Sequence, residues 1–124
     1  MSIKSCGYQL DICIKKGATF TLPITYKDDD GVPIDLTGYS AKMQIRSSPT
    51  STEVIVDLTT ENGGIIIDEE NGLVTAYIDS DATAALDALA NGAYDFFIFL
   101  PGATLVYSDL YGAVKITERT TKWS

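Results

Sequence analysis

The sequence predicts an all-β fold, an antiparallel β-sandwich of about seven to nine strands with one short helix near residues 81–90. Three observations support this prediction. The chain has 124 residues and 45% hydrophobic content, which suits one compact core. Apolar and polar residues alternate in short runs, as they do in half-buried strands. Turn residues separate these runs at intervals of roughly 8–12 residues, which is typical of sandwiches.

We expect one folded domain over residues 8–119, with an N-terminal arm over residues 1–7 and a C-terminal tail over residues 120–124. The longest apolar stretch, residues 94–100, is interrupted by Asp95 and is far shorter than the ~20 residues of a membrane-spanning helix. The start of the chain lacks the apolar run and cleavage site of a secretory signal. The expectation is a protein made and kept in a cytoplasm, with no membrane as partner.

Alternation near the start of the chain predicts the first two strands. Residues 10–14 form the first, and its inward side chains are Leu10, Ile12 and Ile14. Residues 20–26 form the second, with Pro23 on the outward face. Because proline lacks an N–H group, this strand is expected at a sheet edge. The aspartates and glycine of residues 27–31 then predict a turn.

Two hairpins are expected in the middle of the chain. Residues 41–46 alternate and predict a strand solvated on one face, which a polar loop joins to a strand over residues 54–58. Asn71-Gly72 lies between two β-branched runs, residues 65–67 and 73–78. An Asn-Gly pair in that setting is the strongest short-range signal for a hairpin.

The helix is expected to begin after an N-cap at Ser80 and to end at Asn91-Gly92. It should cover one open end of the sheets with an apolar face made of Ala82, Ala85, Leu86 and Leu89. Three further strands are expected to complete the sandwich, over residues 93–100, 104–107 and 111–117.

Composition excludes several function classes. The net charge is −8, there is no histidine, and the nine basic residues form no cluster, so nucleic acid is not expected as a partner. The absence of histidine also removes the usual nucleophilic triads. Cys6 and Cys13 are too few for a disulfide framework or a zinc site, and we expect free thiols, with Cys13 partly buried. No cofactor is expected.

The acidic residues suggest two specific functions, calcium binding and glycoside hydrolysis, but their spacing favours neither. If Gly31 were the sixth residue of a calcium loop, Tyr26 and Thr37 would occupy the first and twelfth positions, where carboxylates belong. The acidic segments therefore indicate turns, and a weak surface calcium site remains an alternative. Glycoside hydrolysis needs two facing carboxylates, but alternation sends Asp11 and Asp57 outward. We expect no enzymatic activity.

Aromatic residues supply the candidate contacts with partners. Both faces of residues 94–99 carry rings, which indicates either a central strand covered on both sides or a partner surface at Phe97 with Tyr107 or Tyr111. A tryptophan near the C-terminus suits docking into a neighbour, or a ring folded back on its own sheet. The candidate contact residues are Tyr8, Pro23, Phe97, Tyr107, Tyr111 and Trp123.

An ordered set of short motifs runs through about nine-tenths of the chain. The motifs are Gly17-x-Thr19, Asp30-Gly31-x-Pro33-x-Asp35-Leu36-Thr37-Gly38, Ala41-x-Met43-x-Ile45-Arg46, Asn71-Gly72, a small helix with Thr83 and Leu86, Gly92-x-Tyr94-Asp95, and Gly112-x-Val114-x-Ile116-Thr117-x-Arg119. As a set they resemble small virion proteins of tailed bacteriophages. They are also similar to the immunoglobulin-like N-terminal domain of phage baseplate upper proteins. The resemblance implies an immunoglobulin-like sandwich that docks onto other virion proteins, with no catalytic residues carried over.

The expected function is thus a structural or docking role in a tailed-phage particle, in the tail, baseplate or fibre-attachment region. Capsid decoration is the alternative, and a carbohydrate-binding module with tyrosines stacked on sugar rings is a third. The expected partners are other virion proteins and copies of the chain itself. Nucleic acid, membranes and small-molecule substrates are not expected. The protein would be located in the virion after synthesis in the cytoplasm of the host bacterium.

Overall fold

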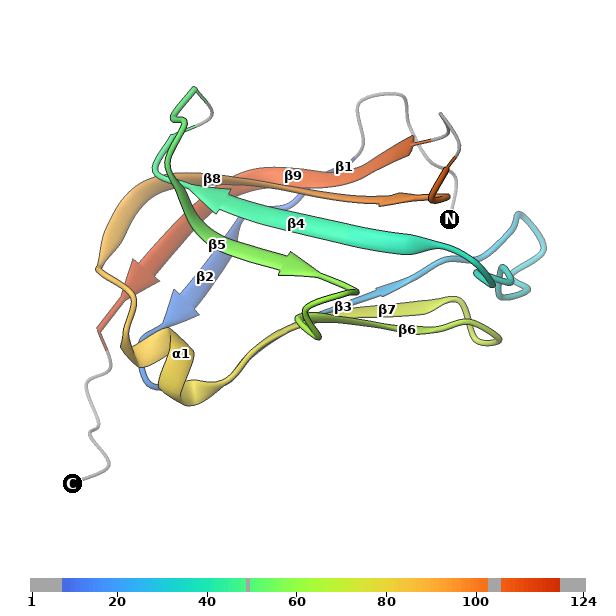
Figure 1. Cartoon of the computed structure of the whole chain (residues 1–124), viewed down its shortest axis with the longest axis horizontal. Coiled ribbons are helices and arrows are strands. Elements are labelled where there is room, and N and C mark those ends of the chain that lie inside the picture. Colours follow the sequence, from blue (N-terminus) through green and yellow to red (C-terminus); the bar gives the residue numbers. More distant parts are fainter. Residues whose placement is uncertain (1–7, 49, 103–105, 119–124) are drawn as a thin grey trace.

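A computed structural model describes residues 8–48, 50–102 and 106–118. In these residues two sheets pack face to face, as Figure 1 shows, and one short helix closes one end. The elements are β1 (Tyr8–Gln9), β2 (Ile12–Lys15), β3 (Phe20–Thr25), β4 (Ser40–Arg46), β5 (Val54–Thr59), β6 (Ile65–Asp68), β7 (Leu73–Ile78), α1 (Ser80–Ala84), β8 (Leu89–Phe99) and β9 (Val106–Thr117). The predicted all-β sandwich is confirmed.

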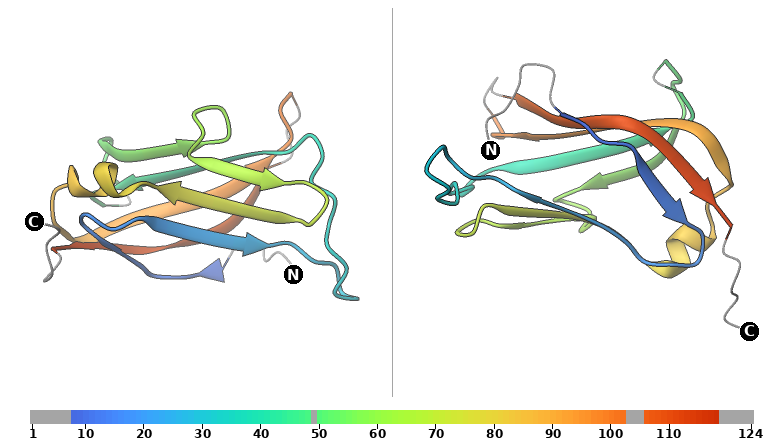
Figure 2. Two further views of the ribbon diagram at one scale, coloured as in Figure 1. Left: turned by 90° about the horizontal axis from the view of Figure 1, so that it is seen from below. Right: turned by 180° about the vertical axis from the view of Figure 1, so that it is seen from behind.

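The strand order is that of an immunoglobulin-like sandwich. The larger sheet has the order β1-β9-β8-β4-β5, with β2 also paired to β9, and the smaller sheet has the order β3-β7-β6. These sets correspond to the CFG and BED groups of that architecture. The sandwich is not wholly antiparallel, because β1 and β2 run parallel to β9. Figure 2 shows the two layers from below and from behind.

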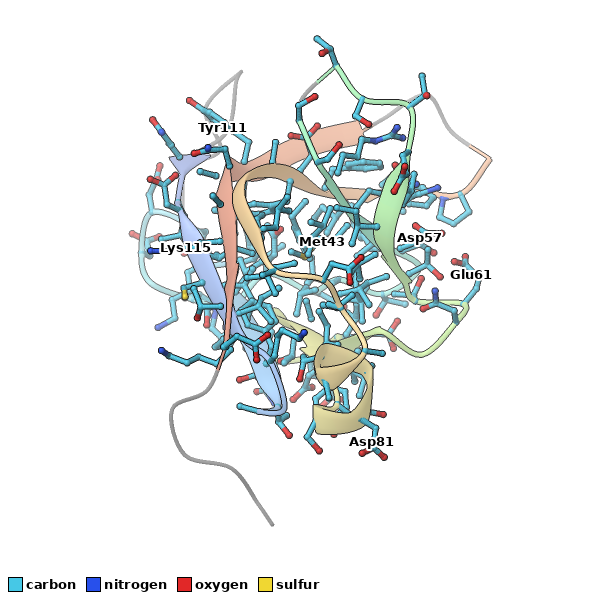
Figure 3. All side chains as sticks on the ribbon, turned by 90° about the vertical axis from the view of Figure 1, so that its left-hand side faces the viewer. Met43, Asp57, Glu61, Asp81, Tyr111 and Lys115 are labelled. Carbon is cyan, nitrogen blue, oxygen red and sulfur yellow. The ribbon has the colours of Figure 1, made fainter. Side chains whose placement is uncertain are left out.

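The core lies between the sheets and follows the predicted alternation. Ala41, Met43 and Ile45 of β4 are fully buried, and they belong to the same buried cluster as Val74 and Ala76 of β7 in the smaller sheet. Figure 3 shows Met43 in the middle of the packed side chains. The other fully buried large side chains are Ile14, Tyr26, Leu36, Ile65, Phe96, Ile98, Val114 and Ile116.

The first predicted strand is broken. β1 ends at Gln9 and β2 begins at Ile12, so Leu10 leaves the core and is 43% exposed. The break has a physical cause in β8 and β9. The Tyr94 hydroxyl donates to the Leu10 carbonyl at 2.6 Å, and the Asp11 carboxylate accepts from Ala113 N–H at 3.0 Å in place of a backbone carbonyl.

Another expectation for this segment was also wrong. Cys13 lies on the outward side of β2 and is exposed, not partly buried. Its neighbours Ile12 and Ile14 take the inward positions, so alternation places the thiol in solvent.

The predicted helix was too long and its cap was misplaced. α1 spans only Ser80–Ala84, and its N-cap is Asp79, whose carboxylate accepts from Ala82 N–H at 2.7 Å. Ala82 and Ala85 are exposed, so the expected apolar face does not exist. Leu89 instead begins β8, where it pairs with Ile116. α1 does cover one end of the sandwich, between β7 and β8 (Figure 1).

Both central hairpins and the edge position of β3 are confirmed. β4 pairs with β5 and β6 with β7, and Gly72 takes a positive φ of 60° in the second turn. β3 pairs only with β7 among the described strands, and Pro23 is exposed there.

The last part of the chain differs from the prediction. The separate strands expected over residues 104–107 and 111–117 are one continuous strand, β9, whose pairing with β8 shifts register between Phe96 and Phe97. The register shift accommodates an extra residue of β9, so the strand continues through the segment between residues 107 and 111, where the sequence predicted a break.

The acidic turn after β3 is built as the sequence indicated. The Asp28 carboxylate accepts from the N–H groups of Asp30 at 2.9 Å and Val32 at 3.0 Å, and Gly31 has a φ of 81°. Asp35 similarly accepts from the hydroxyl group and the N–H group of Thr37; both bonds, the hydroxyl bond most of all, lower the pKa of this carboxyl. These carboxylates therefore have structural roles in turns.

Candidate docking face

The larger sheet has one side turned away from the core, which we call the outer face. Because β4, β8 and β9 are neighbours, their outward residues form rows across it. One row joins Gln44, Asp95 and Tyr111, and the next joins Arg46, Ala93 and Ala113. In Figure 3 the labelled Tyr111, Lys115 and Asp57 lie at the periphery, away from Met43. The face therefore mixes aromatic, polar and small side chains.

A groove of about 410 Å³ lies on this face. Small residues create it, because the facing pair Ala93 and Ala113 fills little of the space above the sheet. Larger side chains flank it: Arg46 of β4, Phe97 of β8 and Tyr111 of β9. The remaining lining residues are Gln9, Gln44, Ser48, Gly92, Tyr94, Asp95 and Gly112.

Arg46 is the cation of the groove, and neutral partners hold its guanidinium in place. Nη1 donates to the Ser51 carbonyl at 2.8 Å, and Nη2 donates to the Gln44 side-chain oxygen at 2.8 Å. Gln44 in turn donates to Asp57 at 3.3 Å. Among the residues that the structure describes, Arg46 forms no ion pair. The guanidinium is thus positioned without an ion pair, and the one carboxylate that lines the groove with it is that of Asp95, in the neighbouring row of the sheet.

One wall of the groove depends on the break between β1 and β2. Tyr94 is 3% exposed, and burial raises its pKa to about 12, with smaller contributions from Asp11 and Asp95. Its neutral hydroxyl therefore holds the Leu10 carbonyl across the pH range in which proteins work. A side chain at Gly112 would meet this same carbonyl oxygen at 2.4 Å, so only glycine fits beside the anchored segment.

The structure brings together two of the six predicted contact residues. Phe97 and Tyr111 both line the groove, with Phe97 half-buried and Tyr111 37% exposed. β8 is central, but no element of the described structure covers its outer side, so the described residues do not show a strand covered on both sides. Phe97 instead stacks at a tilt beside Phe99, with ring centres 6.1 Å apart.

The other four candidates do not join this group in the described structure. Pro23 lies on the smaller sheet, away from the groove. Tyr8 and Tyr107 belong to the backbones of β1 and β9, but their side chains are outside the described part. Trp123 lies beyond the described residues.

Sequence reasoning missed Gln9, Gln44, Arg46 and Asp95 as parts of a site. The alternation in residues 40–46 already turns Gln44 and Arg46 outward, so a signal was present. Alternation does not predict the strand order β9-β8-β4. This order places Arg46 in the row of Ala93 and Ala113.

The chemistry of the groove suits contact with a surface. The chain contains no histidine, and the described residues hold no group of three or more possible metal ligands. No described helix has the length and apolar character needed to cross a membrane. What the groove offers is an arginine, aromatic rings, amide groups and one carboxylate, Asp95. Arginine and aromatic residues are the common anchors of protein interfaces.

Comparison with known proteins supports the fold. No protein-family model matches the sequence, and no curated protein matches it. Solved structures do match, among them one described as "Structure-based site-directed photo-crosslinking analyses of multimeric cell-adhesive interactions of VGSC beta subunits". It has a TM-score of 0.50 and 16% sequence identity over 94% of this chain and 98% of that chain. Since 204 solved chains match, the sandwich alone does not specify a function.

Proposed function

We propose that this chain is a non-enzymatic docking module of a tailed bacteriophage particle, located in the tail, baseplate or fibre-attachment region. The sequence motifs that resemble small virion proteins supply the biological setting. The groove on the outer face supplies the means, because it presents Arg46 with Phe97 and Tyr111 around a small-residue floor. This exposed groove is the observation on which the docking role depends.

Physical considerations favour a protein as the occupant. Aromatic and arginine side chains provide much of the binding energy in protein interfaces, particularly when a neighbour removes them from water. The net charge of −8 opposes nucleic acid. The VGSC beta subunit domain is described as making multimeric adhesive interactions, so an immunoglobulin-like sandwich is compatible with such a role. In the particle, the partners would be other virion proteins and copies of this chain.

Two matched tyrosine variants test this role in assembled particles. Tyr111 on the outer face and Tyr77 on the smaller sheet are similarly exposed, at 37% and 42%. We expect Tyr111→Ser, made in the phage genome, to reduce the copies incorporated per particle, and Tyr77→Ser to leave incorporation unchanged. Quantitative mass spectrometry of purified virions gives the copy number.

Three outcomes would contradict parts of the proposal. If the protein is abundant in infected cells but absent from purified particles, the virion role is wrong. If Tyr77→Ser is the variant that fails to incorporate, the docking face lies on the smaller sheet. If electron microscopy of the particle places the protein on the capsid shell, the tail location is replaced by capsid decoration.

A further inference from the structure

We propose that the groove of the outer face binds the acidic turn of a second copy of this chain, so that copies associate head to tail. The inference rests on the proposed docking function and names one of its partners. It follows from the distribution of charge over the fold, the shape of the acidic turn and the position of Arg46.

Charge is strongly segregated in this molecule. The segments 27–38 and 68–72 contain seven carboxylates and one lysine. These segments lie together, because Leu36 N–H donates to the Glu69 carbonyl at 3.1 Å and Gly38 N–H donates to the Glu69 carboxylate at 3.2 Å. We call them the acidic end, which is at the right in Figure 1.

The outer face has the opposite character. Its outward strand residues include four of the nine basic residues of the chain: Lys15, Lys42, Arg46 and Lys115. Asp57 and Asp95 are its acidic strand residues within the described part, and Asp11 lies at its edge. Among the residues whose side chains the structure describes, cations thus outnumber carboxylates on this face, although the net charge of the chain is −8. Such complementary patches steer association and fix its orientation.

The turn over residues 28–32, which we call the tip, is the part of the acidic end best suited to enter a groove. The Asp28 carboxylate fixes its backbone through Asp30 and Val32, so little conformational entropy is lost on binding. Asp29 and Asp30 are exposed, and Val32 is 55% exposed. The tip therefore presents two carboxylates and one apolar side chain in a prearranged form.

The groove has a counterpart for one carboxylate and for the apolar side chain, and its own carboxylate, Asp95, lies in the row next to Arg46. The Arg46 guanidinium is held by neutral acceptors, and no described carboxylate pairs with it, so it can receive Asp29 or Asp30. The floor of Ala93 and Ala113 leaves space for an apolar side chain such as Val32.

The two surfaces cannot meet within one chain. The tip precedes β4 and Arg46 ends it, so the length of that seven-residue strand, about 20 Å, separates them. They are also different surfaces, which makes the contact heterologous, and repetition of such a contact produces a ring or an open chain. A single turn buries less than the roughly 1,200–2,000 Å² of a standard interface, so the isolated contact is expected to be weak.

Sedimentation velocity of the full chain tests the inference. At concentrations up to about 1 mM the wild type should self-associate in ~0.1 M salt. It should do so much less in ~1 M salt, where the Debye length falls from about 10 to about 3 Å. Arg46→Glu, and the tip variant Asp29→Asn/Asp30→Asn, should each weaken self-association at least about tenfold. The control Asp81→Asn/Asp87→Asn removes the same charge beside α1 and should associate like the wild type.

A mixing experiment identifies the geometry. Arg46→Glu keeps a working tip and the tip variant keeps a working groove, so an equimolar mixture should form 1:1 dimers and nothing larger. Ala113→Glu adds a carboxylate to the groove without touching the bonds of Arg46, and it should behave like Arg46→Glu. This second variant keeps the test valid if Arg46→Glu disturbs folding.

Several results would overturn the inference. A wild type that stays monomeric at every concentration rejects it, while the virion role, which is tested on particles, would stand. A tip variant that still dimerises indicates a symmetric groove-to-groove contact, and association that is insensitive to salt and to both variants places the contact elsewhere.

Discussion

Apart from the tyrosines, Thr83 is the polar residue among the buried side chains of the described structure, and its hydroxyl joins the helix to the turn after β2. It donates to the Ala18 carbonyl at 2.8 Å and accepts from Gly17 N–H at 3.1 Å. Thr83→Val preserves the shape and removes both bonds. The Ala18 carbonyl and the Gly17 N–H would then lie away from water without their hydrogen bonds to Thr83. We therefore expect the free energy of unfolding to fall by about 1–3 kcal/mol. Urea denaturation provides the measurement.

The matched control for this change is Thr21→Val in β3. Thr21 is exposed, so the same chemical replacement should alter the free energy of unfolding by less than about 0.5 kcal/mol. Equal losses in the two variants would show that the Thr83 hydroxyl is not structurally important.

Tyr94 should produce a pH-dependent contribution to stability. Its pKa in the folded chain is raised to about 12, chiefly by burial, whereas an unfolded tyrosine titrates near 10. A raised pKa means that the stabilisation is fully present below about pH 10 and is lost as the pH rises toward 12. We therefore expect the difference in unfolding free energy between wild type and Tyr94→Phe to be constant below about pH 10 and to shrink above it.

The comparison with Tyr94→Phe cancels the pH dependence that the two proteins share. Denaturant titrations at steps between about pH 8 and pH 12 give the two curves. A difference that stays flat to pH 12 would mean that Tyr94 ionises freely in the folded chain and that the Leu10 carbonyl is not held by it.

At the scale of elements, α1 is short enough for its cap to matter. A five-residue helix has few internal hydrogen bonds, and the Asp79 carboxylate satisfies one free donor at its start. Asp79→Ala should lower the free energy of unfolding by about 1 kcal/mol, whereas Ser80→Ala should have little effect. Chemical denaturation compares them directly. A larger loss for Ser80→Ala would restore the cap expected from sequence.

The elements that sequence predicted correctly are those with local causes. The strands over residues 40–46 and 65–78 follow from alternation and from Asn71-Gly72, all of which are visible within a short window. The break at Leu10 was missed because its cause, the hydroxyl of Tyr94, lies 84 residues away. The predicted helix was too long because Leu89 fits a helical pattern locally but forms a strand through its pairing with Ile116.

The candidate face was predictable in part for the same reason. Phe97 and Tyr111 were candidates from sequence because both are aromatic residues on predicted strands. Arg46 enters the site only because β4 lies beside β8, and no local pattern specifies that neighbour. Composition indicated a contact surface, and the sheet order determined which residues form it.

At the scale of the whole molecule, the charge asymmetry must affect stability. Folding gathers the seven carboxylates of the acidic end into two adjacent segments. Their mutual repulsion is therefore stronger in the folded chain than in the extended chain, and it lowers the stability of the fold. Salt screens this repulsion. The thermal midpoint of the wild type should therefore rise with added sodium chloride.

Neutralising chosen carboxylates distinguishes repulsion from other effects of salt. Asp29, Asp30 and Glu70 are exposed and accept no hydrogen bond from the described residues, so Asp29→Asn/Asp30→Asn/Glu70→Gln should raise the thermal midpoint in low salt and reduce its salt dependence. Asp28→Ala should lower the midpoint, although it also removes a negative charge, because the Asp28 carboxylate holds the turn through two N–H groups. Thermal unfolding followed by circular dichroism at ~0.02 M and ~1 M salt measures both effects. If the triple variant is no more stable than the wild type in low salt, the acidic end is not a site of repulsion, and its carboxylates are screened well enough by solvent to leave the fold undisturbed.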